Sequence, residues 1–184
     1  MAVRRLLVLA FVACLLAVSA ASSLAVSEAA CEEGAGKLYV VCMTTVLASI
    51  VEQVGGPYVD VEAIVPPGFC PGHYDIRPSD VEAVRQADVL IGHIAVFPWM
   101  EDLLEAAGRS TEELHMLSGP WNTPYTAISY VKNITAILCE HPETNSTMRD
   151  YFVSMNETIC SELLALAEGL EARATSLGTD SIKV

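Results

Sequence analysis

Residues 37–65 read KLYVVCMTTVLASIVEQVGGPYVDVEAIV, and this stretch decides the fold. Its first seven residues form a short apolar run that is typical of a strand buried in a parallel sheet. Thr44 and Thr45 then supply turn or N-cap positions, and the apolar residues of 46–54 recur at helical spacing. Two glycines end this helix, and residues 59–65 form a second apolar run. The stretch therefore predicts a strand, a helix and a second strand in succession.

The same alternation continues along the chain. It comprises a helix at 80–86 capped by Ser79, a strand at 89–92, a helix at 99–107 with Pro98 in its first turn, and a strand at 114–117. Alternating strands and helices favour an open sheet with right-handed crossovers. The predicted fold class is therefore α/β, with an open, mainly parallel four-stranded sheet and flanking helices.

The pattern changes after residue 122. A helix is predicted from Thr123 and Pro124 to Cys139. Beyond Asn145, apolar residues recur at steps of three and four: Met148, Phe152, Met155, Ile159, Leu163, Leu166 and Leu170. This spacing predicts one amphipathic helix of about 30 residues, roughly 45 Å long. Such a helix exceeds what one small α/β unit needs, so we expect the helix over 145–178 to lead into a second unit that begins at 179–184.

The first 21 residues have the layout of a secretory signal peptide. Arg4 and Arg5 precede an uncharged apolar run that ends in small residues. An uncleaved membrane anchor is the alternative, although the run is slightly short for a span of about 20 residues. Residues 22–36 are small and acidic and indicate a flexible spacer. We therefore expect an exported protein, periplasmic or at the cell surface.

Charge and cysteine content agree with export. The net charge of −13 argues against binding to nucleic acid or anionic membranes by charge. Five cysteines follow the predicted signal, and an odd number leaves at least one thiol free, paired to another chain, or used as a metal ligand. Three Asn-x-Ser/Thr triplets are either glycosylation sites or ordinary polar positions: Asn133, Asn145 and Asn156.

Residues 66–80, PPGFCPGHYDIRPSD, form a loop with four prolines and two glycines. In open parallel sheets ligands bind at the carboxyl ends of the strands, so this loop, Thr44, Thr45 and residues 92–95 share one ligand-binding edge. The loop carries Cys70 and His73 in Cys-x-x-His spacing, and the next strand end offers His93. Thiolate and imidazole suit zinc or another transition metal. Cys70, His73 and His93 are therefore the predicted metal ligands.

Other roles for these residues remain open. Cys70 is alternatively an apolar residue or a disulfide partner of Cys42, with His73 bonded to local carbonyls. As a nucleophile and base, Cys70 and His73 are poorly arranged on a proline-rich loop. The chain has no nucleophile elbow, Walker loop or dinucleotide fingerprint. Neither enzymatic activity nor an organic cofactor is predicted.

Three segments carry a resemblance to a known family: residues 37–68, 73–92 (HYDIRPSDVEAVRQADVLIG) and 97–104 (FPWMEDLL). With their strand, Pro-Pro-Gly loop and Pro-Ser-Asp helix start in the same order, they resemble the solute-binding proteins of zinc and manganese ABC importers. The resemblance implies an exported protein of two α/β lobes joined by one rigid helix. It also implies a transition metal ion or metal chelate held between the lobes, and delivery to a membrane permease. This chain would supply the amino-terminal lobe, 37–140, and the linker helix.

The chain departs from that family at the expected ligands. The family loop reads Pro-Pro-Gly-x-Asp-Pro-His-x-Tyr-Glu, which places Cys70 on its Asp and Gly72 on its liganding His, with His73 one position later. The family's Pro-His-x-Trp stretch matches Trp121 here, without the His. Thr44, Thr45, Tyr74 and Trp121 are the predicted cleft residues. A secreted surface or adhesion protein on the same fold, without metal transport, is the alternative function.

Overall fold

The computed structural model describes residues 36–93 and 98–178. Four sequence-based expectations lie wholly or largely outside these residues: the signal peptide at 1–21, the spacer at 22–36, the second half of the 92–95 strand end, and the start of a second unit at 179–184. Every structural statement below refers to the described residues.

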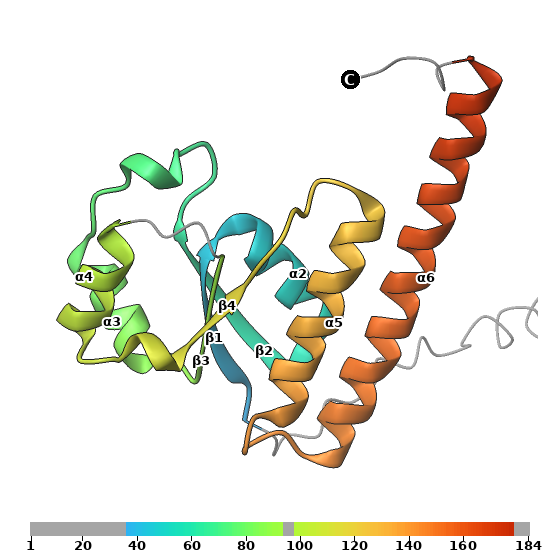
Figure 1. Cartoon of the computed structure of the whole chain (residues 1–184). Coiled ribbons are helices and arrows are strands. Elements are labelled where there is room, and N and C mark those ends of the chain that lie inside the picture. The colour runs from blue at the N-terminus through green and yellow to red at the C-terminus, as the bar shows by residue number, and fades with distance from the viewer. Residues whose placement is uncertain (1–35, 94–97, 179–184) are drawn as a thin grey trace, which may run out of the picture. The chain divides into compact units, whose positions relative to one another are not determined.

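Four parallel strands form one sheet in the order β2-β1-β3-β4 (Figure 1). They are β1 (Leu38–Thr44), β2 (Val59–Val65), β3 (Val89–His93) and β4 (Leu114–Leu117). The chain passes from β2 back across β1 to β3, so the direction of winding reverses beside β1. A crevice at the carboxyl ends of the strands is expected at such a reversal. The predicted open parallel α/β sheet is confirmed.

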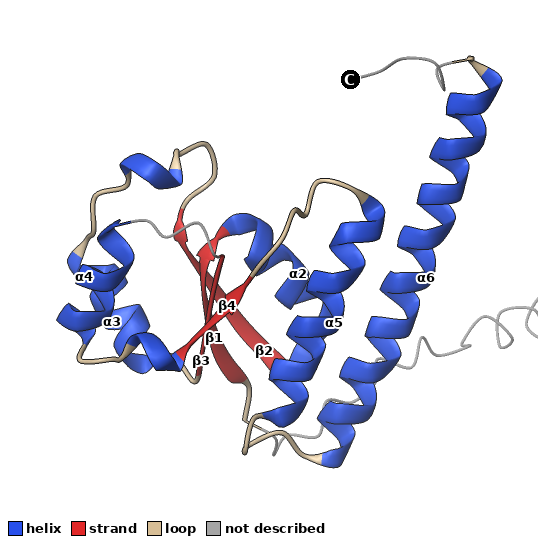
Figure 2. Ribbon diagram, in the orientation of Figure 1, coloured by secondary structure: helices blue, strands red, loops and turns tan. Residues whose placement is uncertain are grey.

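Helices cover both faces of the sheet (Figure 2). On one face lie α2 (Thr45–Gly55), α5 (Pro124–Glu140) and α6 (Ser146–Ser176), and on the other lie α3 (Pro78–Gln86) and α4 (Pro98–Ala107). Alternate residues of β1 pack into the helical layers on the two faces of the sheet, because successive side chains of a strand point to opposite faces. Val40 and Cys42 join the core with α2 and α5, whereas Val41 and Met43 join the core with α3 and α4.

The start of α3 corrects one prediction. Ser79 is not its cap: Arg77 is the N-cap residue, and Pro78 opens the helix. Proline at the first helical position is favoured because its φ already suits a helix and its missing N–H would have no partner there. Asp80 completes the start of the helix, since its Oδ2 accepts a hydrogen bond from the Arg77 backbone N–H at 2.8 Å. The helix therefore begins slightly earlier than predicted.

The long helix predicted beyond Asn145 is confirmed as α6, with 31 residues. The Asn145 side chain caps it by accepting a hydrogen bond from the Met148 N–H at 2.9 Å. Its first half is packed against α2 and α5, with Phe152 fully buried. Figure 1 shows the end of α6 continuing past the start of α5. In the second half of α6, Leu166 and Leu170 are 53% and 52% exposed.

Within the described ranges, no helix is both long enough and apolar enough to cross a bilayer.

Candidate functional site

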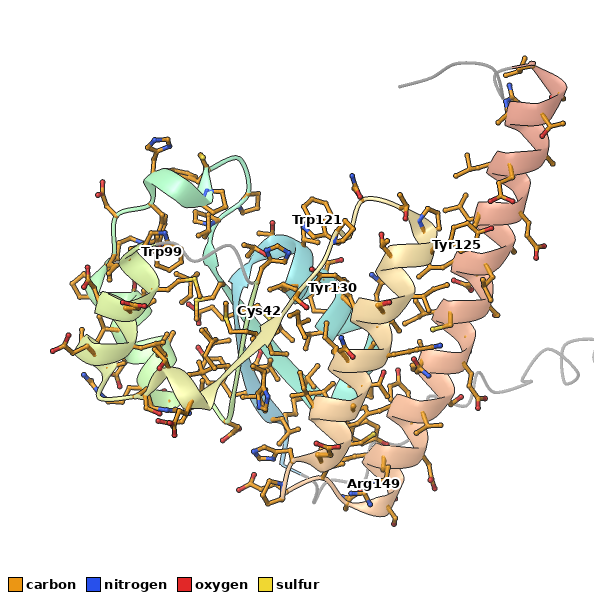
Figure 3. All side chains as sticks on the ribbon, in the orientation of Figure 1. Cys42, Trp99, Trp121, Tyr125, Tyr130 and Arg149 are labelled. Atoms are coloured by element: carbon orange, nitrogen blue, oxygen red, sulfur yellow. The ribbon has the colours of Figure 1, made fainter. Side chains whose placement is uncertain are left out.

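A hollow of about 420 Å³ opens at the carboxyl ends of β1, β2 and β3. Its walls come from four separate segments. The β1–α2 junction contributes Thr44 and Thr45, the loop after β2 contributes Phe69, β3 contributes His93, and the loop before α5 contributes Trp121. Figure 3 shows Trp121 on that last loop, beyond the carboxyl ends of the strands. The hollow thus occupies the edge where the parallel fold is expected to bind a ligand.

The orientation of His93 is set by the carbonyl of Gly119. His93 Nε2 lies 3.1 Å from Gly119 O, and the Tyr130 hydroxyl donates to the same oxygen at 2.6 Å. The His93 ring also stacks on Tyr130, with centroids 6.1 Å apart and an interplanar angle of 14°. Because a carbonyl only accepts, Nε2 carries the proton of a neutral His93 ring in this contact. Burial raises the pKa of Tyr130, which keeps its hydroxyl protonated as a donor.

Gly119 has a backbone conformation that suits this role. Its φ is +96°, in the left-handed region that favours glycine. A side chain here would strain the backbone that aims the carbonyl at both His93 and Tyr130. Carbonyl contacts of this kind hold ligand-binding histidines in one orientation.

The loop over residues 66–80 is held in place by the buried carboxylate of Asp80. Its Oδ2 accepts from the Tyr74 hydroxyl at 2.8 Å and from the Arg77 N–H at 2.8 Å. The Arg77 guanidinium lies 3.4 Å from Oδ1 and sits over the Tyr74 ring at 5.5 Å from its centroid. Burial, reinforced by the hydrogen bond to Asp80, raises the pKa of Tyr74. Tyr74 therefore remains a protonated donor to Asp80.

Trp99 of α4 fixes the middle of the same loop. Its indole Nε1–H donates to Pro71 O at 2.7 Å, at the start of the 3-10 turn Pro71–His73. The Tyr74 and Trp99 rings meet edge to face with centroids 5.4 Å apart. Phe69 and Pro71, which line the hollow, are thus presented by a loop that is bonded to α3 and α4. Figure 3 shows Trp99 on α4, which carries this contact.

Four predicted site residues surround the hollow and three do not. Thr44, Thr45, His93 and Trp121 line it. Cys70 and His73 are exposed on the neighbouring 3-10 turn, where the His73 N–H donates to Cys70 O at 3.0 Å. Within the described residues, no three His, Cys, Asp or Glu side chains come close enough together to hold a metal ion. A ligand role for Cys70, His73 and His93 therefore stays a prediction.

Tyr74 lies in the core between the sheet and α3 and α4, and the residue is 8% exposed. It does not line the hollow, so it acts on the site through Asp80 and the loop. Its role as a cleft residue stays a prediction.

The cysteines at 42 and 70 do not form the alternative disulfide. Both are free: Cys42 is fully buried in β1, whereas Cys70 is exposed on the loop. Burial, with a smaller contribution from Glu52, raises the pKa of Cys42 to about 12. Cys139 and Cys160 are also free. Cys42 is therefore an uncharged core residue.

The three possible glycosylation residues lie on α5 and at α6. Asn133 is exposed on α5, Asn145 caps α6 through its side chain, and Asn156 is half-buried within α6. Their glycosylation stays a prediction.

Sequence reasoning missed Phe69, Asp80 and Gly119 as parts of the site. Phe69 is a large apolar residue in a loop, and its position at the predicted ligand edge was a usable signal. An acidic residue three positions after a helix start indicates a cap, which was the signal for Asp80. Nothing in the sequence indicated that Gly119 O would meet His93, 26 residues earlier.

Comparisons with known proteins agree with this architecture. Residues 40–182 match the family described as zinc-uptake complex component A, periplasmic. The manganese-binding lipoprotein MntA of Halalkalibacterium halodurans is 33% identical over 96 residues, which cover 52% of this chain and 32% of that protein. The matches to three curated relatives span only 22%, 25% and 32% of their lengths.

Solved structures share the fold at low sequence identity. The metal-dependent lipoprotein YcdH of Bacillus subtilis superposes with a TM-score of 0.63 and 18% identity, over 76% of this chain and 56% of that one. Zn(II)-bound AdcA of Streptococcus pneumoniae gives a TM-score of 0.60 and 19% identity, over 73% of this chain and 32% of that one. With a family match across most of its length and the same lobe architecture, the chain belongs to the zinc-uptake complex component A family of metal-type ABC solute-binding proteins.

Proposed function

We propose that this chain provides the amino-terminal lobe and linker helix of an exported solute-binding protein. The protein captures a transition metal, zinc or manganese, as an ion or as a chelate, and delivers it to an ABC permease in the membrane. It performs no chemical step on its solute. Relatives named as manganese-binding and as zinc-bound support the choice of metal, and relatives named as lipoproteins support a location outside the cytoplasm.

The observation that carries this proposal is the hollow at the carboxyl edge of the sheet. It lies where parallel α/β folds bind ligands, and it presents the imidazole of His93 with its ring fixed by Gly119 and Tyr130. Imidazole is a ligand common to zinc, copper, iron and nickel sites. Cys70 and His73 are further ligand candidates on the adjoining turn, and the exposure of that turn leaves both side chains accessible to a solute.

Metal analysis of the purified chain tests the proposal. After equilibrium dialysis against zinc or manganese, supplied as the chloride or as a chelate, bound metal is measured by mass spectrometry for the unaltered chain, for His93→Ala, and for the double variant Cys70→Ser/His73→Ala. Because this chain would supply one of the two lobes that hold the metal, we expect weak binding by the unaltered chain and still less bound metal in His93→Ala. His115→Ala is the matched control, since His115 is exposed on β4 and does not line the hollow.

The double variant decides the part played by the loop. Metal content equal to that of the unaltered chain removes Cys70 and His73 as ligands. Failure of the unaltered chain to bind zinc or manganese both as the bare ion and as a chelate contradicts the proposal and favours the alternative of a surface protein without metal transport.

A further inference from the structure

The hollow has the dimensions of a site for an organic molecule. Its volume is about 420 Å³. Sites for small organic ligands typically measure about 300–1,000 Å³, whereas a bound zinc ion lies only about 2.0–2.3 Å from its ligand atoms. A bare ion would therefore occupy a small part of this space.

The walls of the hollow are mainly apolar and uncharged. Among its described lining residues, the polar side chains are Thr44, Thr45 and His93, and none is Asp, Glu, Lys or Arg. A dehydrated divalent ion requires several donor atoms or negative charges to replace its water. A chelator brings its own donors and neutralises the ion, so a metal complex can enter an apolar hollow without that cost.

Two exposed aromatic side chains face this space from different loops. Phe69, before α3, is 63% exposed, and Trp121, before α5, is 47% exposed, and both line the hollow. Exposed aromatic side chains of this size are costly in water and gain most from covering a flat apolar surface. The rigid attachment of each loop favours a preformed site: Trp99 and Asp80 hold the first loop, and the Gly119 carbonyl holds the second.

We propose that the solute of this hollow is a metal complex of a small, flat organic chelator, with Phe69 and Trp121 covering the chelator. This inference rests on the proposed function and specifies its solute class. His93 supplies the one side chain of a metal-binding type among the described lining residues. His93 would therefore bind the metal of the complex at one coordination position, and the chelator would fill the others.

Calorimetric titration of the full chain with three probes tests this inference. The probes are zinc chloride, the one-to-one zinc complex of 1,10-phenanthroline, and metal-free 1,10-phenanthroline. We expect the complex to bind with a Kd at least about tenfold below that of either other probe, because it alone satisfies both the aromatic walls and the imidazole. Phe69→Ala and Trp121→Ala should each weaken binding of the complex and leave binding of zinc chloride unchanged.

Leu166→Ala is the matched control, because Leu166 is an equally exposed apolar residue on α6 that does not line the hollow. It should bind all three probes as the unaltered chain does. If zinc chloride binds as tightly as the complex, the inference is overturned while the proposed capture of a metal stands. If metal-free phenanthroline binds as tightly as its zinc complex, the inference is overturned, because the metal then adds nothing to binding. If no probe binds, both the inference and the metal-capture proposal are overturned.

Discussion

At the scale of single residues, Asp80 holds the loop over 66–80 against α3 through its hydrogen bonds. Its carboxylate is only 2% exposed, yet one of its oxygens accepts from the Tyr74 hydroxyl and from the Arg77 N–H. A buried charge is tolerated when its hydrogen bonds are satisfied. Because these bonds join the end of the loop over 66–80 to the first turn of α3, the shape of the hollow depends on a residue that does not line it.

Replacing Asp80 by Ala should destabilise the chain by about 2–4 kcal/mol. The buried Tyr74 hydroxyl loses its acceptor at a cost of roughly 1–3 kcal/mol, and the part-buried Arg77 N–H loses its acceptor at a smaller cost. The free energy of unfolding in urea measures the effect. Asp75→Ala is the control and should stay within about 0.5 kcal/mol, because Asp75 is exposed on the same loop. Equal stability of the two variants would show that the Asp80 contacts do not hold the loop.

Cys42 gives a stability that depends on pH. Its pKa is raised to about 12 in the folded chain from the ordinary value of 9.0. Between these values the unfolded chain releases the thiol proton while the folded chain keeps it, so the free energy of unfolding falls as pH rises. Urea unfolding at pH 8 and pH 10 should show a smaller decline for Cys42→Val than for the unaltered chain. Identical declines would contradict the assigned burial of the thiol.

At the scale of elements, α6 divides into two halves with different energetics. Apolar residues at steps of three and four run along the whole helix. They are packed against the core with α2 and α5 as far as Leu163, and Ala167 is also buried, whereas Leu166 and Leu170 are more than half exposed. The Tyr125 hydroxyl donates to Glu171 at 2.9 Å, which ties the start of α5 to the second half of α6 at one point. The residues of α6 up to Ala167 therefore stabilise the fold through burial, and the exposed side chains of Leu166 and Leu170 contribute little to it.

Matched truncations on α6 test this division. Phe152→Ala should lower the free energy of unfolding by about 3–5 kcal/mol, the usual cost of a large buried aromatic, because Phe152 is fully buried. Leu170→Ala, on the same helix and 52% exposed, should change it by less than about 0.5 kcal/mol. If the two variants lose comparable free energy of unfolding, Leu170 is buried in solution rather than exposed.

The elements were largely predictable from the sequence because their signals are local. Apolar runs identified the strands, and the regular spacing from Met148 to Leu170 identified α6. The cap of α3 was misassigned because Pro78 shifts the helix start away from Ser79. The walls of the site could not be predicted in the same way, since they depend on contacts between distant residues: Trp99 bonds to Pro71, and His93 to Gly119.

At the scale of the whole described fold, one sheet serves two cores. Val41 and Cys42 are adjacent in β1, yet they pack into the layers on opposite faces. Loss of either core exposes the shared strand and removes support from the other. The two layers should therefore unfold together.

Two optical probes can test this cooperativity in Trp121→Phe, which leaves Trp99 as the single tryptophan of the chain, so that its fluorescence can be excited selectively. Trp99 reports on the face covered by α3 and α4, and helical circular dichroism is dominated by the longer helices α5 and α6 on the other face. Their urea transitions should coincide, as expected of a two-state domain. Separate midpoints would show that one layer survives without the other.

The edges of the sheet have a consequence for behaviour at high concentration. An unpaired outer strand is a template on which a second chain can add a strand and begin to aggregate. On β2, Asp60 and Glu62 are both exposed, so an incoming copy of the same strand would bring like charges together. On the opposite edge, β4 has only four residues and offers little length for pairing. The charges on β2 and the short length of β4 thus both oppose fibril growth by strand addition.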